Sequence, residues 1–206
     1  MVALPYTLEA DSLARKYENS YVKRQREELE SLCGAPLRIS GRGTTGTEAA
    51  TVCQCAVSPF YILRTDYATL DSPVRCGHCD ASVPLYRLDK RENFDQLLSW
   101  ETNYVSCDSL QMNCTVGERW ATQQMSDPRS ALSREGRVQA AELEAATGVP
   151  VFYYLYNYRA TSAARDRKRP CPVCGQPWLL HEPIGKLYAF MCEADRLISS
   201  VTFNSQ

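Results

Sequence analysis

The sequence contains little histidine, no long apolar run and almost no net charge. It has two histidines among 206 residues and a formal net charge of −1. So few histidines give no basis for a Ser-His-Asp arrangement or for a histidine-rich catalytic zinc site. A net charge near zero excludes a general attraction to nucleic acid or to an anionic membrane, so any such binding must be local. We therefore expect a protein that is not an enzyme.

No apolar run reaches the roughly 20 residues that a membrane-spanning helix needs. Residues 1–6 also lack the basic region and the long apolar stretch of a secretory signal. We expect a cytoplasmic protein with no membrane partner. The ten cysteines of such a chain, several of them at C-x-C and C-x-x-C spacing, point to metal binding rather than to disulfides.

The densest metal-binding pattern lies near the C-terminus. Cys171 and Cys174 are separated by two residues and followed by glycine, which is typical of a zinc knuckle. Two short strands around a turn lead to Cys192, and Asp195 occupies the position where a second C-x-x-C would place a thiolate. The spacing predicts a zinc ribbon held by these four residues, with His181 as the alternative fourth ligand. A ribbon without metal is the other possibility.

A second set of ligands lies earlier in the chain. The pairs Cys53/Cys55 and Cys76/Cys79 are separated by about twenty residues, which fits a site of four thiolates. The competing interpretation is a redox dithiol, because Cys-Gly-His-Cys also occurs in disulfide isomerases. A thioredoxin-type dithiol begins a helix, whereas a pattern typical of a strand follows here at residues 83–88. Metal binding is therefore favoured, with His78 as a turn residue.

The remaining pattern alternates between helical and extended segments. Helical periodicity covers residues 12–32 and 93–115, and a further helical region starts near residue 126. Trp100, Tyr104, Cys107, Gln111 and Cys114 form one stripe down a helix face, on which Cys107 and Cys114 are expected to pack in a core; Cys33 is also expected to be buried. We predict an α+β fold with small antiparallel sheets, zinc ribbons and several packed helices. The expected domains are a helical lobe with the central four-cysteine site (1–150) and an aromatic strand with the ribbon (151–206).

A basic run precedes the C-terminal knuckle. It contains Arg159, Arg165, Arg167, Lys168 and Arg169, interrupted by Asp166. Residues 151–206 hold seven lysines and arginines against four acidic residues, a net charge of +3. This run could contact phosphates or could be a solvated linker. The tyrosine-rich face of residues 151–158 is expected in the core, although an exposed tyrosine there could stack on a base.

Several segments together resemble a known family. They are residues 72–88, 110–119, 124–127, 153–156 and 171–197. They are similar to an uncharacterised proteobacterial family described as zinc-ribbon-containing proteins with a suggested role in nucleic-acid binding. The resemblance covers most of the chain from about Cys53 onward. In that family the ribbon closes with a cysteine before Arg-Leu, whereas Asp195 precedes Arg196-Leu197 here.

These observations lead to two expected functions. The first is a non-catalytic protein that holds Zn²⁺ and binds RNA or DNA through its basic C-terminal segment. The second is a zinc-stabilised module that docks on a protein partner and does not bind nucleic acid. The resemblance supports the first function, but it supplies no mechanism, catalytic residue or small-molecule substrate.

Overall fold

A mixed sheet of six strands forms the centre of the fold, in the order β2-β1-β3-β6-β5-β4. The structure is a computed structural model, and it describes residues 7, 9–41, 43, 52–69, 71–88, 93–158, 162–185 and 187–202. Helices and strands follow one another irregularly along the chain, so the predicted α+β class is confirmed. The strands join one sheet rather than several small antiparallel sheets, because β3 pairs in parallel with both β1 and β6.

The strands come from two separate parts of the chain. Their bounds are Tyr61–Leu63 (β1), Val74–Cys76 (β2), Val151–Tyr154 (β3), Leu179–Ile184 (β4), Tyr188–Cys192 (β5) and Leu197–Ser200 (β6). The pair β1 and β2 is antiparallel, and β4, β5 and β6 form an antiparallel meander. Strand β3 connects these two groups. The predicted boundary near residue 150 falls just before β3, and the division into two domains stays a prediction.

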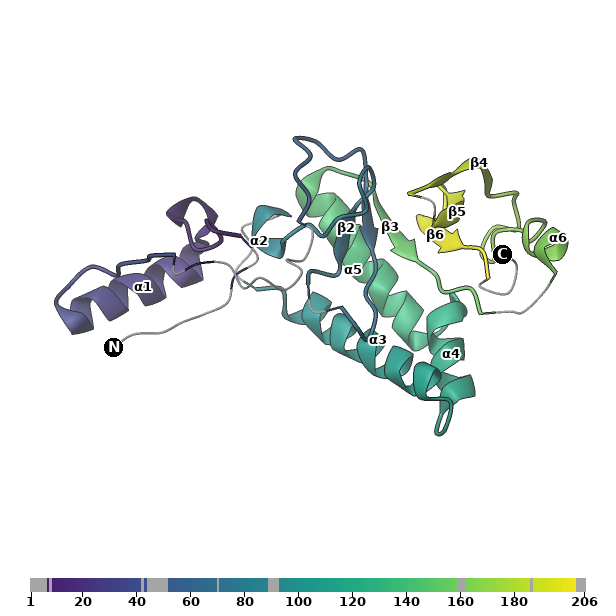
Figure 1. The fold of residues 1–206 in the computed structure, drawn as a ribbon, viewed down its shortest axis with the longest axis horizontal. Coiled ribbons are helices and arrows are strands. Elements are labelled where there is room, and N and C mark those ends of the chain that lie inside the picture. The colour runs from purple at the N-terminus through teal and green to yellow at the C-terminus, as the bar shows by residue number, and fades with distance from the viewer. Residues whose placement is uncertain are drawn as a thin grey trace.

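Three helices pack together beside the first strands (Figure 1). They are α3 (Asp95–Asn113), α4 (Glu118–Ser126) and α5 (Ala131–Thr147). Trp100 and Tyr104, one helical turn apart on α3, are buried in the same core as Tyr153 of β3. The predicted stripe on α3 is buried as far as Gln111. Cys114 follows the last residue of the helix and is exposed, so its predicted burial is wrong.

The opposite face of the sheet carries a smaller apolar cluster, which consists of Ile62, Phe152, Tyr154, Tyr188 and Ile198. Arginines lie over its aromatic rings. The guanidinium carbon of Arg64 is 5.4 Å from the centre of the Tyr154 ring, and that of Arg196 is 5.5 Å from the centre of the Phe152 ring. The aromatic strand is therefore part of the core, as expected, whereas Tyr158 beyond its end is half exposed.

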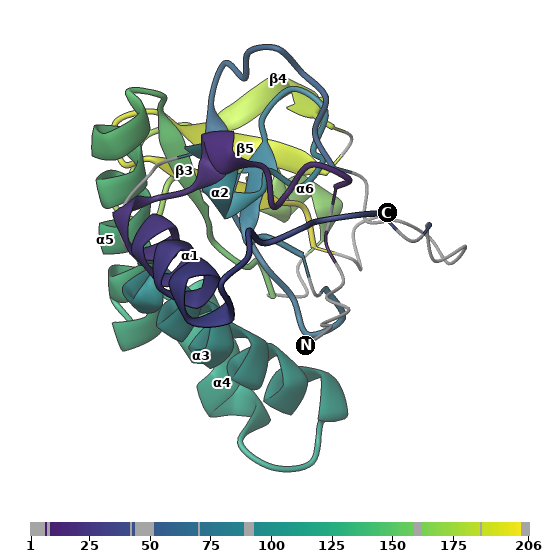
Figure 2. The ribbon, with the colours of Figure 1, turned by 90° about the vertical axis from the view of Figure 1, so that its left-hand side faces the viewer.

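Helix α1 (Ser20–Cys33) extends away from the sheet and from the other long helices (Figures 1 and 2). The Asn19 side chain caps it by accepting a hydrogen bond from the Val22 N–H at 2.8 Å. Gly34 ends it in the left-handed conformation. No residue of α1 is buried. The predicted burial of Cys33 is therefore wrong.

The segment at residues 83–88 differs from the predicted strand. It contains the short helix α2 (Leu85–Leu88), in which the Arg87 N–H donates to the Pro84 carbonyl at 3.0 Å. Pro84 directly precedes the helix, and its carbonyl accepts this first bond. Another short helix, α6 (Ala163–Asp166), precedes the C-terminal knuckle. None of the helices in the described ranges is both long and apolar enough to cross a membrane.

Candidate metal centres

The four cysteines of the N-terminal pattern converge at the end of β2. The sulfur atoms of Cys53, Cys55, Cys76 and Cys79 all lie within 4.8 Å of one another. The sulfurs of Cys53 and Cys79 are 3.6 Å apart. A tetrahedral zinc ion with bonds of about 2.3 Å would separate its sulfur ligands by about 3.8 Å. This group, called the first centre below, therefore has the size to hold one metal ion.

Backbone contacts bring the two halves of the first centre together. Cys76 is the last residue of β2, and Cys79 lies in the turn that follows. The Cys53 N–H donates to the Ser82 carbonyl at 2.8 Å, which holds residues 52–55 beside this turn. Arg87 on α2 donates to the Cys53 carbonyl at 2.7 Å. Residues 83–88, which the sequence pattern predicted as a strand, thus contain a short helix, and this helix holds the backbone of Cys53 in place.

The second centre lies at the end of β5. The sulfurs of Cys171, Cys174 and Cys192 and a carboxylate oxygen of Asp195 also lie within 4.8 Å of one another. Asp195 Oδ2 is 3.1 Å from the Cys171 sulfur and 3.2 Å from the Cys192 sulfur. Cys171 and Cys192 are buried, whereas Cys174 is exposed. This centre could hold a metal ion through three sulfurs and one oxygen.

The two centres are built from turns of the same kind. Gly175, directly after its C-x-x-C pair, has a φ of 74° and donates its N–H to the carbonyl of the first cysteine at 2.9 Å. Asp80 makes the equivalent bond at 2.8 Å with a φ of 56°. Arg196, directly after Asp195, has a φ of 51°. Glycine suits this left-handed position in the turn at Cys171, whereas aspartate and arginine, which occupy it in the other two turns, enter the left-handed region less often.

Cys76 has the environment of a thiolate. Burial opposes its ionisation, but contacts of its sulfur with the Ser58 hydroxyl and with the backbone N–H groups of Cys79 and His78 outweigh burial and lower its pKa to about 6. The Ser58 oxygen is 3.3 Å from the Cys76 sulfur. Burial instead raises the pKa of Cys53 to about 12. Metals bind the thiolate form of cysteine, which these contacts favour at Cys76.

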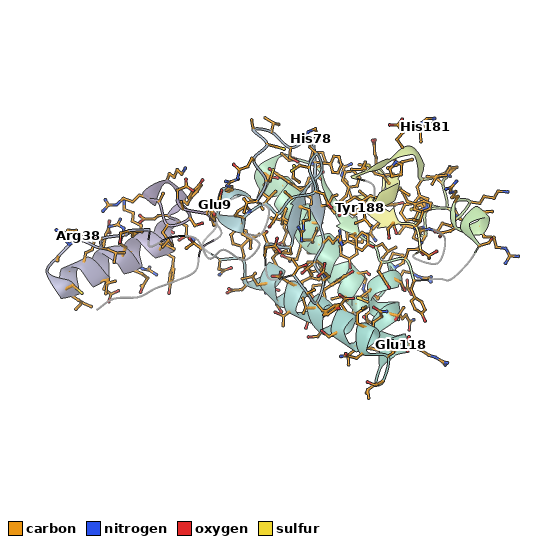
Figure 3. The ribbon with its side chains drawn as sticks, in the orientation of Figure 1. Glu9, Arg38, His78, Glu118, His181 and Tyr188 are labelled. Carbon is orange, nitrogen blue, oxygen red and sulfur yellow. The ribbon has the colours of Figure 1, made fainter. Side chains whose placement is uncertain are left out.

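Neither histidine belongs to the two centres. Within the described ranges, the groups that could hold a metal contain cysteines and Asp195 alone. His78 and His181 are both exposed and lie at the surface in Figure 3. His181 as an alternative fourth ligand is therefore wrong. The Cys76/Cys79 pair also lacks a following helix N-terminus, because α2 begins only at Leu85.

A hydrogen-bonded chain connects the first centre to the C-terminal strands. Tyr188 on β5 donates its hydroxyl to Asp80 at 2.8 Å and accepts a bond from Arg64 at 3.1 Å. Asp80 directly follows the ligand Cys79, and β5 continues to the ligand Cys192. Tyr188 is fully buried between the two groups of strands (Figure 3). No local pattern in the sequence indicates this link, because the partners of Tyr188 are 108 and 124 residues away.

Replacing Tyr188 with phenylalanine should lower the free energy of unfolding by about 1–3 kcal/mol, because Asp80 and Arg64 each lose a buried hydrogen-bond partner. Denaturant unfolding monitored by circular dichroism measures this change. Tyr158→Phe is the matched control, since this tyrosine is half exposed, and its effect should stay within about 0.5 kcal/mol. Equal effects of the two substitutions would contradict a structural role for the Tyr188 hydroxyl.

Three of the predicted basic residues are exposed just before the second centre. They are Arg165 on α6 and the adjacent Arg167 and Lys168. Asp166, which interrupts the basic run in the sequence, is buried and accepts a hydrogen bond from the Asn157 amide at 3.0 Å. The surface of this segment is therefore cationic without an exposed acidic residue between the cations.

Arg169 does not lie with these three residues. Its guanidinium carbon is 4.0 Å from the centre of the Phe190 ring, and it donates to the Ser200 carbonyl at 3.0 Å and pairs with Asp166 at 3.2 Å. Burial lowers its pKa. Arg169 thus holds the C-terminal strands together and is not part of the exposed basic surface formed by Arg165, Arg167 and Lys168. Arg159 lies outside the described residues.

The fold and the site define an α+β protein with two cysteine-rich groups that could each hold a metal ion. The family described as "Domain of unknown function (DUF2310)" matches residues 55–156. A second family, "Domain of unknown function (DUF8594)", matches residues 160–205. These two matches contain the ligands of both centres except Cys53. No solved structure matches the chain.

Two proteins from Haemophilus influenzae, both described as "Uncharacterized protein", are similar to the chain. The first is 33% identical over 201 residues, which cover 95% of this chain and 76% of the relative. The second is 37% identical over 147 residues, which cover 70% of this chain and 72% of the relative. The chain therefore belongs to the same family as these proteins, the family of the DUF2310 domain.

Proposed function

We propose that the chain is a non-catalytic zinc protein that binds nucleic acid through Arg165, Arg167 and Lys168. The observation that supports this function is the burial of Asp166. Its carboxylate is used by internal hydrogen bonds and by the ion pair with Arg169, so it does not neutralise the cations beside it. Exposed arginine and lysine side chains contact phosphates and release counterions when they do so. Tyr158, half exposed at the end of the aromatic strand, is the candidate for base stacking.

The proposed metal is zinc, because soft thiolate ligands favour it over magnesium, calcium and manganese. The first centre offers four sulfurs, which is the ligand set of a structural zinc site rather than that of an open catalytic site. All ten cysteines are free of disulfides. Free thiols in this number fit the reducing cytoplasm, and we include that location in the proposal.

Neutralising the basic segment tests the function. The triple variant Arg165→Gln/Arg167→Gln/Lys168→Gln should bind single-stranded RNA or DNA more weakly at every sequence, because phosphate contacts position a protein without reading bases. Each lost contact removes roughly 0.7–0.9 from the slope of log K against log salt concentration. Fluorescence anisotropy over a range of salt concentrations should therefore show the slope flattening by about 2.

The control removes the same charge elsewhere on the surface. Lys23, Arg24 and Arg119 are exposed and lie on α1 and α4. Their triple glutamine variant should bind as the unmodified protein does. Replacing Tyr158 with alanine should weaken binding to single strands more than to duplexes, since stacking needs an unpaired base. Undetectable binding at low salt, or equal losses in the two triple variants, would contradict the proposal.

Docking on a protein partner is the second candidate function, and helix α1 favours it. Tyr21, Val22, Leu29 and Leu32 are 50%, 47%, 43% and 80% exposed on this projecting helix. Exposed apolar groups of this kind mark interaction surfaces. Affinity capture from cells, with and without nuclease treatment, separates the two functions. Partners lost on nuclease treatment support nucleic-acid binding, whereas proteins that persist, and that Leu29→Glu releases, support docking.

A further inference from the structure

The second centre differs from the first in one ligand. Asp195 occupies the position of the second cysteine of a knuckle, as shown by the left-handed Arg196 after it and by the pairing of Cys192 with Leu197 across the turn. Its carboxylate is within hydrogen-bond distance of two cluster sulfurs. The backbone therefore has the form of a four-cysteine site, while one of the four ligand atoms is an oxygen.

Among the described residues, the hydrogen bonds to this carboxylate come from the centre itself, and Arg137 outside the centre attracts it through its charge. Its hydrogen bonds come from the thiols of Cys171 and Cys192, whose sulfurs are 3.1 and 3.2 Å from the Asp195 oxygen. These donors are the thiols of the centre itself, and they lose their protons when they bind a metal. By contrast, Glu144 receives hydrogen bonds from the Arg196 guanidinium and from the Val151 N–H. A ligating carboxylate is usually held by such outer partners, which Asp195 lacks among the described residues.

The same side of the centre is open to solvent. Cys174 is exposed and Asp195 is partly exposed, whereas Cys171 and Cys192 are buried. A small molecule can thus approach a bound metal from the side of the carboxylate. Oxygen is a harder donor than sulfur, so a metal selected by three thiolates also prefers a thiolate in its fourth position.

We propose that Asp195 is an exchangeable ligand, and that a small exogenous thiol replaces it on the metal of the second centre. In this step the thiol sulfur bonds to the metal, the bond from the metal to the Asp195 oxygen breaks, and the thiol proton leaves to solvent. The metal keeps its charge and its three cysteines. The first centre, with four protein sulfurs, undergoes no such exchange. This inference rests on the metal binding proposed above and not on nucleic-acid binding.

Cobalt substitution tests the exchange, because the sulfur-to-cobalt charge-transfer absorption grows with the number of cobalt–sulfur bonds. The full chain is loaded with Co²⁺ to one ion per centre and titrated with 2-mercaptoethanol. The band should gain the intensity of one further cobalt–sulfur bond in a saturable manner. Asp195→Cys should begin at the higher intensity and show no further gain. Asp195→Ala should take up the thiol at a lower concentration than the unmodified protein, since no carboxylate competes.

Glu193→Gln is the matched control, because Glu193 is an exposed acidic residue two positions away and should leave the titration unchanged. Three outcomes would overturn the proposal: a band that does not change in the unmodified protein, a band that thiol bleaches by removing the cobalt, and a gain of equal size in Asp195→Cys. The proposal would also be overturned if the unmodified chain binds one Co²⁺ and the Asp195→Cys variant binds two. In that case the second centre would need a fourth sulfur to bind the metal at all. If Asp195→Cys does not fold, the comparison with Asp195→Ala decides the result.

Discussion

Replacing Cys76 with serine should empty the first centre and lower the free energy of unfolding by about 4 kcal/mol, because loss of a structural metal is among the few single changes with so large an effect. Cys76 is 1% exposed and is the thiol whose ionised form the surrounding donors favour. Metal analysis of freshly purified protein should fall by one zinc per chain. Thermal and denaturant unfolding should both report the lost stability.

A matched cysteine substitution separates metal loss from a general effect of removing a thiol. Cys114 is exposed, and its sulfur contacts the carbonyls of Gln111 and Met112 in its own turn. Cys114→Ser should keep the full metal content and change stability by no more than about 0.5 kcal/mol. If Cys76→Ser retains its metal and its stability, the first centre is not a structural metal site.

The grouping of the candidate ligands could be predicted from the sequence because their spacing is local. A C-x-x-C pair forms its own tight turn, so the spacing of Cys171 and Cys174 predicts a zinc knuckle independently of the rest of the sequence. The convergence of the two halves of each centre followed from the short strands between them. The place of Asp195 beside the three cysteines could also be anticipated, since it has the spacing of a second pair to Cys192 and lies near its sulfur in the structure; its role as a metal ligand stays a prediction.

Features that depend on distant contacts could not be predicted. Arg169 belongs to a basic run in the sequence, but its neighbours in space are Phe190 and Ser200, which draw it into the interior. The single mixed sheet depends on the parallel pairing of β3 with β1 and β6, and no local pattern encodes that pairing. Helix α4 was missed because it is short and most of its surface is polar. Its burial comes from α3 and α5, which lie on either side of it in the chain.

The aromatic core around Trp100 and Tyr153 explains why a glycine lies in the middle of helix α5. Gly136 on α5 is buried, and a methyl group there would lie 2.5 Å from the Trp100 indole nitrogen and closer still to the Tyr153 ring. Both aromatic side chains are fully buried, with ring centres 6.0 Å apart, so neither can move aside freely. The space that a helix normally reserves for a side chain is here filled by the aromatic core of α3 and β3.

Two substitutions and their combination test this packing. Trp100→Ala should lower the free energy of unfolding by about 3–5 kcal/mol through the cavity that it leaves. Gly136→Ala should cost about 1–3 kcal/mol through overpacking, although helix propensity alone would make alanine about 1 kcal/mol better than glycine. In the Trp100→Ala background the added methyl group has room. Gly136→Ala should therefore cost less or even stabilise the protein, with a coupling of about 0.5–3 kcal/mol between the two sites.

Val138→Ala, at a half-exposed position of the same helix, is the control, and its effect should add to that of Trp100→Ala without coupling. Additive costs for Gly136→Ala would show that the indole does not occupy the space beside this glycine.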